Sequence, residues 1–276
     1  MFSERSFSAS DGRELFYRTA QVRAARAVVV IVHGFGEHSG RYLETMERFA
    51  VEGHASYAMD LRGFGRSARI RGHIERVDLV LEDLRILTQL ARLEYPGKPV
   101  VLLGHSMGGL LALRQLIHHQ EDYDLAITSG PAILPPENAS TFMIGMSRIL
   151  AAVAPLLPVS KLEEGADTRN QELREQDEHD VLIWKGGFRA RTGNELLRAQ
   201  FEVTNRLGEI TLPLLALHGG DDRIINPRAT GLVVEGVGSS DVTRVVFPGL
   251  YHEVMNEPER DEVFATMFGW LRERLE

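Results

Sequence analysis

Residues 99–118 read PVVLLGHSMGGLLALRQLIH, and this stretch decides the fold. An apolar run leads into the pattern Gly-x-Ser-x-Gly at Gly104, Ser106 and Gly108, and a second apolar run of helical length follows it. A strand, a sharp turn and a helix in this order lift the serine hydroxyl at a strained bend, while the glycines let strand and helix pass close to it. We therefore predict that Ser106 is a nucleophile; an ordinary glycine-rich turn is the competing interpretation.

Similar short apolar runs occur on both sides of this stretch. They lie at 27–32 (AVVVIV), 212–217 (LPLLAL) and 243–247 (TRVVF), and weaker candidates lie at 55–59 and 125–129. Strands that are apolar on both faces are typical of a parallel sheet covered by helices on both sides. Helical periodicity occurs between these runs, at 77–93, 109–118 and 258–275. The alternation predicts a doubly wound α/β fold with a mostly parallel central sheet.

The two remaining parts of the chain differ from this alternation. The opening runs at 2–8 and 14–18 are joined through Asp11 and Gly12, which predicts a β-hairpin. Residues 133–210 contain no convincing strand, are first apolar and then charged, and include a predicted helix at 193–204. We predict that 133–210 is a helical cap insertion over the carboxyl edge of the sheet, where open α/β sheets bind ligands. The core then consists of 1–132 and 211–276.

The composition excludes several classes of function. With 276 residues, 43% hydrophobic and 25% charged, the chain is long enough for one domain with an insertion. The formal net charge of −8 argues against nucleic-acid binding, and the absence of cysteine excludes disulfides and cysteine-rich zinc sites. The longest uncharged apolar stretch, 149–159, is too short to span a bilayer, and the N-terminus lacks a secretory pattern. We expect a cytoplasmic protein.

A serine alkoxide that attacks a carbonyl creates a negatively charged oxygen, which backbone N–H groups must stabilise. One donor should be Met107, which follows the nucleophile. The loop after the run at 27–32 reads HGFGEHSGRY at 33–42, and we assign the second donor to Phe35 in this loop. A purely structural glycine turn is the alternative.

The serine also needs a base and an acid, which follow it along the chain in the order acid and then histidine. His252 lies in the turn after the last strand, within TRVVFPGLYHE at 243–253. The penultimate strand is followed by Asp221 and Asp222, within LPLLALHGGDDRIINP at 212–227. The spacing of a glycine, two residues and an aspartate from Gly219 favours Asp222, and Asp221 stays open as the alternative.

Four motifs together resemble those of the monoacylglycerol lipases and related lysophospholipases, which are α/β-hydrolases. They are HGFGEHSGRY at 33–42, DLRGFGRS at 60–67, GHSMGG at 104–109 and GGDDRIINP at 219–227, and the resemblance extends through the cap run SKLEEGADTRNQELREQDEHD at 160–180. The resemblance implies a carboxylester hydrolase that cleaves monoacylglycerols or similar lipid monoesters to fatty acid and glycerol through an acyl-enzyme. It implies a lipid ester as substrate and neither a cofactor nor a metal. A lysophospholipase and a general carboxylesterase stay open as alternatives.

The resemblance also implies roles for further residues. It places Glu37, Arg41 and His105 near the glycerol end of the substrate, although the spacing of Glu37 and Arg41 also fits an internal ion pair that braces the oxyanion loop. It implies that a cap segment, here FMIGMSRILAAVAPLLP at 142–158, docks on membranes or micelles; packing on the core is the alternative. The chain departs from better-known members in Phe35, where alanine is common, and in the charged later half of the cap. Acyl-chain length and head group therefore stay open.

Three other functions compete with this interpretation. An aminopeptidase needs cap carboxylates to hold a substrate ammonium, and the candidates are Glu163, Glu164, Asp167 and Glu172. A catalytically inactive binding protein on the same fold would be expected to lack a member of the triad, whereas all three are present here. A metal site would draw on the adjacent pairs His118-His119 and Asp221-Asp222, but neighbouring residues rarely face one centre, so we expect no metal.

Overall fold

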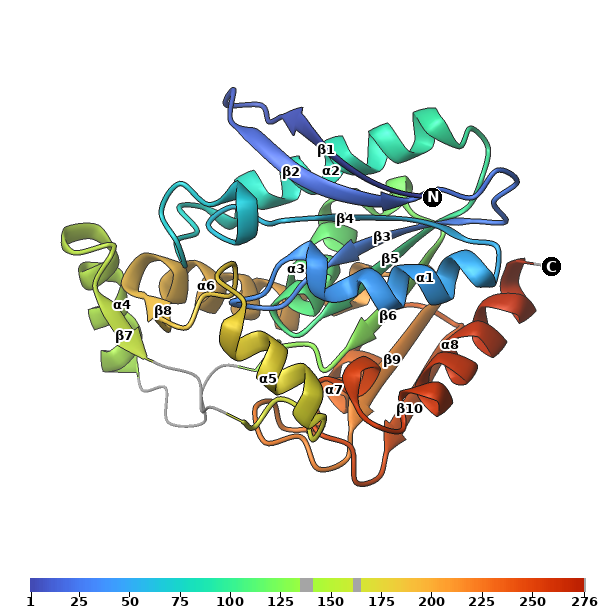
Figure 1. The fold of residues 1–276 in the computed structure, drawn as a ribbon. Coiled ribbons are helices and arrows are strands. Elements are labelled where there is room, and N and C mark those ends of the chain that lie inside the picture. Colours follow the sequence, from blue (N-terminus) through green and yellow to red (C-terminus); the bar gives the residue numbers. More distant parts are fainter. Residues whose placement is uncertain (135–140, 161–164, 276) are drawn as a thin grey trace.

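The computed structural model describes residues 1–134, 141–160 and 165–275, and its centre is an eight-stranded sheet (Figure 1). The strand order is β1-β2-β4-β3-β5-β6-β9-β10. The strands are β1 (Phe2–Ser8), β2 (Glu14–Ala20), β3 (Val28–Val32), β4 (Ala55–Met59), β5 (Val100–His105), β6 (Leu125–Ser129), β9 (Leu214–Gly219) and β10 (Val242–Phe247). Along this order, the six neighbouring strands β4, β3, β5, β6, β9 and β10 are parallel. The hairpin β1–β2 joins β4 in antiparallel fashion.

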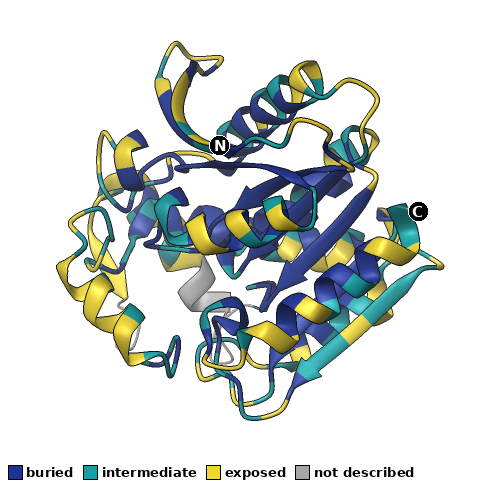
Figure 2. Ribbon diagram, turned by 45° about the vertical axis from the view of Figure 1, so that its right-hand side comes forward, coloured by how far each residue is buried: buried dark blue, intermediate teal, exposed yellow. Residues whose placement is uncertain are grey.

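The central strands are buried on both faces, as their apolar sequences predict. Every residue of β3, β4, β5, β6 and β9 is buried, and Figure 2 shows these strands as the dark blue centre of the molecule. Successive residues of a strand point to opposite faces. In β3, Val28, Val30 and Val32 therefore belong to one hydrophobic cluster, while Val29 and Ile31 belong to the other.

Helices cover both faces of the sheet. The apolar residues of α1 (Leu43–Val51) and α8 (Arg260–Leu275) lie in one cluster, and those of α2 (Val77–Glu94), α3 (Met107–His119) and α7 (Arg228–Gly236) lie in the other. This arrangement confirms the predicted doubly wound α/β fold. The sequence pattern did not predict α1 and α7, which are nine residues long and have only three buried residues each.

The segment between β6 and β9 lies at one end of the sheet (Figure 1). Its elements are α4 (Thr141–Val153), β7 (Pro158–Ser160), α5 (Gln171–His179), β8 (Phe188–Arg189) and α6 (Ala190–Arg206). The expectation that this segment contains no strand was wrong, because β7 and β8 form a small antiparallel sheet. Such short strands bury too little to leave an apolar pattern, and all of β7 is exposed. None of the described helices is both long and apolar enough to cross a membrane.

Candidate active site

Ser106 occupies a sharp bend between β5 and α3. Its backbone has φ 54° and ψ −119°, and it is the only non-glycine residue with positive φ among the residues that the structure describes. Such a conformation costs on the order of 1–3 kcal/mol and persists only where the surroundings hold it. Here the Ser106 N–H donates to Ser129 O at 2.9 Å, and its carbonyl accepts from Leu110 N at 3.1 Å and Ala132 N at 3.0 Å. The bend is therefore fixed from β6 and from α3.

The two glycines of the motif are required by close approaches of the backbone. A Cβ atom on Gly108 would lie 2.0 Å from the carbonyl oxygen of Val32, at the end of β3. A Cβ atom on Gly104 would lie 2.4 Å from the carbonyl oxygen of Gly108. Because both neighbours are backbone atoms that cannot move aside, a side chain at either position would displace α3 from the sheet.

The loop after β3 lies against the serine. A Cβ atom on Gly34 would be 3.3 Å from the Cβ atom of Ser106, and Phe35 follows Gly34 directly. The Phe35 ring stacks on Phe188 of β8, with centroids 4.0 Å apart, and meets Phe64 edge to face at 5.3 Å. Met107 is the first residue of α3, so its N–H has no acceptor within the helix. The two predicted oxyanion donors thus belong to segments that meet at Ser106.

His252 and Asp222 are in direct contact. His252 Nδ1 lies 2.6 Å from Asp222 Oδ2. The other carboxylate oxygen, Oδ1, accepts from the backbone N–H groups of Ile224 at 2.8 Å and Ile225 at 2.9 Å. Asp221, by contrast, has an exposed side chain. Of the two candidate aspartates, the structure therefore brings only Asp222 to the histidine.

Asp222 and His252 shift each other's pKa toward the charged form. Burial acts to raise the pKa of Asp222, but hydrogen bonds from His218 and His252 outweigh it and hold the pKa well below its usual value. Burial acts to lower the pKa of His252, but the hydrogen bond and charge of Asp222 outweigh it, so this pKa lies above its usual value. A carboxylate that stays ionised beside the imidazole both orients it and stabilises its cation.

Ser106 and His252 are brought to the same edge of the sheet. The ring of His105, the residue before Ser106, lies 4.7 Å from the His252 ring, centroid to centroid. A Cβ atom on Gly130, the residue after the Ser129 that holds Ser106, would lie 3.0 Å from the His252 imidazole. His252 Nε2, the nitrogen opposite Asp222, is buried and has no hydrogen-bond partner among the described residues. It is thus available to receive a proton.

Behind His252 lies a buried charge network centred on Arg41. Its guanidinium donates to Glu253 at 2.8 Å and 3.0 Å and to Asp177 of α5 at 3.0 Å and 2.6 Å. Its Nη1 also lies 3.4 Å from Glu37 Oε1, which is the ion pair that the sequence spacing suggested. Glu37 Oε2 in turn accepts from the N–H of Gly34 at 3.2 Å. The network therefore ties the oxyanion loop to the turn that carries His252.

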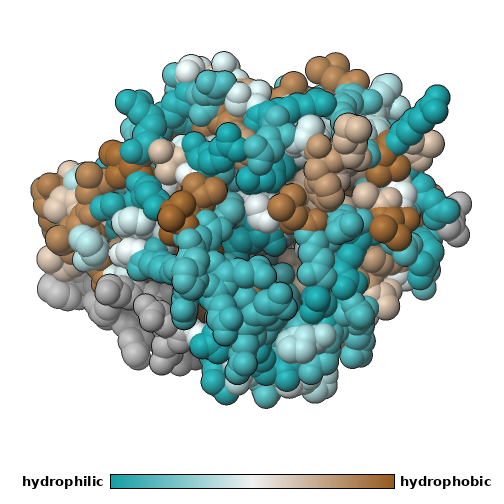
Figure 3. All heavy atoms as spheres, viewed as in Figure 1, coloured by the Kyte–Doolittle hydropathy of each residue, from teal (hydrophilic) through white to brown (hydrophobic). Residues whose placement is uncertain are grey.

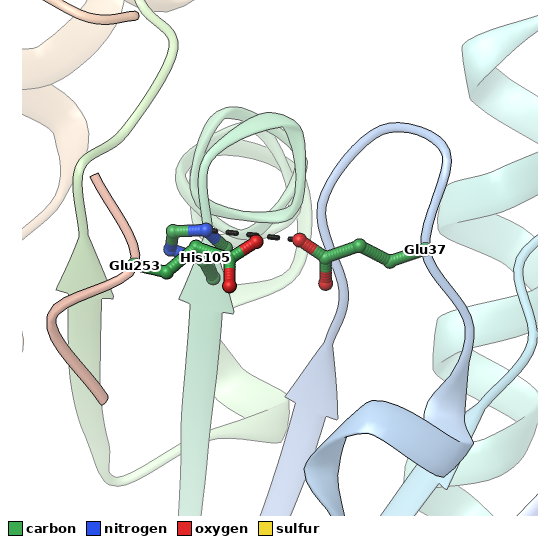
Figure 4. A group of neighbouring side chains, drawn as sticks. All are labelled: Glu37, His105 and Glu253. Carbon is green, nitrogen blue, oxygen red and sulfur yellow. Dashed lines mark ion pairs between the residues drawn. The ribbon is translucent and has the colours of Figure 1, made fainter. Parts of the chain in front are cut away.

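His105 takes part in this network from the floor of the site. It is buried, its Nδ1 lies 3.3 Å from Ser129 Oγ, and its Nε2 lies 3.8 Å from Glu37 Oε1. Figure 4 shows the side chains of Glu37, His105 and Glu253 converging. The burial of Glu37 and Arg41 supports the bracing role that their spacing suggested, and His105 is buried beside them. Contact with substrate stays a prediction for all three.

The same three groups could hold a metal ion by distance alone. Glu37, His105 and Glu253 offer ligand atoms within 4.8 Å of one another. However, the Arg41 cation already pairs with both carboxylates, and a divalent ion would have to bind beside it at a cost in repulsion. A second group, His119, Glu121 and Asp122, lies near the surface, where Asp122 is paired with Arg85 at 2.9 Å.

Three residues of the site had no place in the sequence argument. Glu253 follows His252 directly in the sequence, so its place near the site could have been predicted. Nothing in the sequence, however, indicates that an acid in this position pairs with Arg41. Asp177 lies in a run of charged residues on α5, and sequence alone does not single it out. His218 contacts Asp222, with Nε2 2.9 Å from Oδ2, although it stands in a strand that predicts only core packing.

The carboxylates considered for an aminopeptidase are only partly described. Glu163 and Glu164 lie outside the described residues, and Glu172 is exposed on α5. Asp167 lies beside the catalytic turn, because its carbonyl accepts from Glu253 N at 2.9 Å. Its Oδ1 is buried without a hydrogen-bond partner in the described part of the chain, and burial raises its pKa.

Comparison with known proteins adds a family and several relatives. Residues 23–259 match the family described as "Serine aminopeptidase, S33". The chain is 34% identical to a monoacylglycerol lipase of Mycolicibacterium smegmatis, over 98% of this chain and 96% of that protein. It is 30% identical to the human monoglyceride lipase, over 96% and 89% of the two chains. The crystal structure of the Paleococcus ferrophilus monoacylglycerol lipase superposes with a TM-score of 0.84 at 27% identity, covering 93% of this chain and 98% of that one.

Proposed function

The chain belongs to the serine aminopeptidase S33 family and to the family of the monoacylglycerol lipases among the α/β-hydrolases, and on this premise we propose that it hydrolyses monoacylglycerols. Ser106 is the nucleophile, His252 the base and Asp222 the acid. The observation that carries this assignment is the 2.6 Å contact of His252 with Asp222, whose other oxygen accepts two backbone hydrogen bonds, at the sheet edge that carries the half-buried Ser106.

The reaction proceeds by acyl transfer in two steps. His252 Nε2 takes the proton of Ser106 Oγ as the oxygen attacks the ester carbonyl, and the amides of Phe35 and Met107 stabilise the oxyanion. The protonated His252 then gives its proton to the departing glycerol oxygen, which leaves an acyl-serine. A water molecule, deprotonated by the same histidine, attacks the acyl-serine and releases the fatty acid. The free serine is regenerated.

The segment 133–210 is proposed to act as a cap over this site, with 1–132 and 211–276 as the catalytic core. The stacking of Phe188 on Phe35 and the pairing of Asp177 with Arg41 support this role, because both bind the segment to residues next to the triad.

Apolar side chains gather on the outside of the cap. In Figure 3 they occupy the end of the molecule where α4 and β7 lie in Figure 1. The exposed ones are Met146, Ile149, Val153, Leu156, Leu157 and Val159. Exposed apolar patches mark contacts with membranes or other proteins. We place the protein in the cytoplasm, in peripheral contact with lipid surfaces through this patch.

An aminopeptidase is the second candidate, and Asp167 is the observation that favours it. A carboxylate oxygen beside the catalytic turn that has no partner among the described residues is the group that would hold a substrate ammonium. On this hypothesis Asp167→Asn abolishes the hydrolysis of aminoacyl p-nitroanilides and spares that of p-nitrophenyl esters. The esterase proposal predicts instead that the wild-type protein cleaves the esters and leaves the anilides intact.

The test is a turnover panel with purified protein. Monoacylglycerols should be cleaved at higher kcat/KM than diacylglycerols, triacylglycerols and lysophospholipids, and a fluorophosphonate should label the protein at Ser106. Ser106→Ala should fold normally, lose labelling and lose turnover by several orders of magnitude. Undiminished turnover in Ser106→Ala would refute the mechanism, and a preference for lysophospholipids would refute the substrate.

A further inference from the structure

His252 is not the only histidine on the carboxylate of Asp222. His218, near the end of β9, points its Nε2 at the same oxygen, Oδ2, from a distance of 2.9 Å. The side chains of His218 and Asp222 are fully buried, and the His252 side chain is 4% exposed. Two imidazoles therefore lie against one buried carboxylate oxygen.

The surroundings of His218 fix the position of its proton. Its Nε2 also lies 3.0 Å from the carbonyl oxygen of Ile225, which can only accept a hydrogen bond. Since both neighbours of Nε2 are acceptors, Nε2 carries the hydrogen. The opposite nitrogen, Nδ1, is bonded to the hydroxyl of Thr230 on α7, which is buried as well. A hydroxyl can donate a hydrogen bond to Nδ1, an arrangement compatible with the hydrogen on Nε2.

We propose that His218, held by Thr230, is a positioning residue for the catalytic acid: its Nε2 group fixes the carboxylate of Asp222 against His252. This inference rests on the triad proposed above. The carboxylate accepts hydrogen bonds from Ile224 and Ile225 on one oxygen and from His252 on the other, and His218 Nε2 lies 2.9 Å from that second oxygen. The orientation of the carboxylate is thereby set from outside the triad.

Sharing an oxygen has a consequence of definite sign for His252. The groups that face the His252 imidazole are Asp222, His105, Glu253 and Glu37, with Arg41 behind the last two. Of these, Asp222 stabilises the imidazolium most directly. If the His218 contact is removed, the Asp222 carboxylate loses a group that orients it, its contact with His252 weakens, and the pKa of His252 falls.

The experiment compares His218→Leu, which removes the donor, with His218→Gln, whose amide N–H can replace it, and with Thr230→Val. In His218→Leu, kcat for a monoacylglycerol should fall about 10- to 100-fold while KM changes little, because the His252 imidazole loses the fixed carboxylate that orients it and stabilises its cation. The acidic limb of its kcat/KM profile should move to lower pH. Thr230→Val should move the limb in the same direction by less, and His218→Gln should restore most of the turnover.

The free energy of unfolding is measured for each variant. If His218→Leu does not fold, the shift of the acidic limb is tested with Thr230→Val. An acidic limb that stays in place or moves to higher pH would overturn the inference, and so would a turnover in His218→Gln as low as in His218→Leu. Asp222→Asn and Ser106→Ala are measured alongside. If these two keep full activity, the proposed triad itself is wrong; if they are inactive while the His218 variants match the wild type, only the role of His218 fails.

Discussion

Arg41 and Asp177 are 136 residues apart in the chain and are joined by two hydrogen bonds, Nε to Oδ1 at 3.0 Å and Nη2 to Oδ2 at 2.6 Å. Arg41 belongs to the segment after the oxyanion loop, whereas Asp177 belongs to α5 between β6 and β9. The Arg41 side chain is 5% exposed and that of Asp177 is 18% exposed. This paired, forked geometry is the strongest arrangement available to an arginine and a carboxylate.

Asp177→Ala should therefore lower the free energy of unfolding by about 1–3 kcal/mol, because Arg41 loses two charge-assisted bonds in a buried place. Chemical unfolding followed by circular dichroism measures the change. Glu178→Ala is the matched control, since Glu178 is the next residue of α5 and is exposed. Equal stability of the two variants would show that the pair does not hold α5 in solution.

Asp222→Asn should reduce kcat by roughly 10³- to 10⁴-fold, because an amide can neither orient the imidazole correctly nor stabilise its cation. Asp221→Asn should leave kcat within a factor of about 2, since the Asp221 side chain is exposed. Steady-state kinetics on one ester substrate compares the two. Equal losses in both variants would contradict the assignment.

The strain at Ser106 should be measurable as stability. Ser106→Gly removes the unfavourable positive φ, whereas Ser106→Ala keeps it and removes the same hydroxyl. Ser106→Gly should be the more stable of the two by about 1 kcal/mol, after the larger chain entropy of glycine in the unfolded state is allowed for. Both variants should be inactive. A more stable alanine variant would show that the bend is not strained.

The pH dependence of kcat/KM should show an acidic limb above 6.5, the usual pKa of histidine. The pKa of His252 is raised, and His252 must be neutral to accept the serine proton, so activity rises as pH increases through this value. Initial rates over pH 5–9 on a substrate that does not titrate measure the limb. A limb below 6.5 would mean that Asp222 does not stabilise the imidazolium of the free enzyme.

Protonation of His252 should have the opposite effect on stability. Since the folded-state pKa is raised, its contribution is fully present below about pH 6.5 and is lost as pH rises through the raised pKa. The difference in unfolding free energy between the wild type and His252→Gln should accordingly shrink from pH 5.5 to pH 9. A difference that grows with pH would contradict the raised pKa.

The sequence by itself determined the elements whose signals are local. The bend at Ser106 is predicted by a strand, two glycines and a helix that are contiguous in the sequence. The strands β3, β5 and β9 are predicted by runs that are apolar on both faces. The predicted ends of β3 and β9 lie within two residues of the observed ones. Short helices such as α1 and α7 bury too few side chains to leave a clear period.

Only the tertiary structure decided which polar groups meet. The contact of Asp222 with His252 agrees with the spacing from Gly219, but Asp221 could be set aside only when its side chain proved to be exposed. The contacts of Arg41 with Asp177, of Phe35 with Phe188 and of His218 with Asp222 join segments that no local pattern connects. The physical reason is range: backbone preference and apolar periodicity act over a few neighbouring residues, whereas a buried charge finds its partner only after the sheet has brought distant loops to one edge.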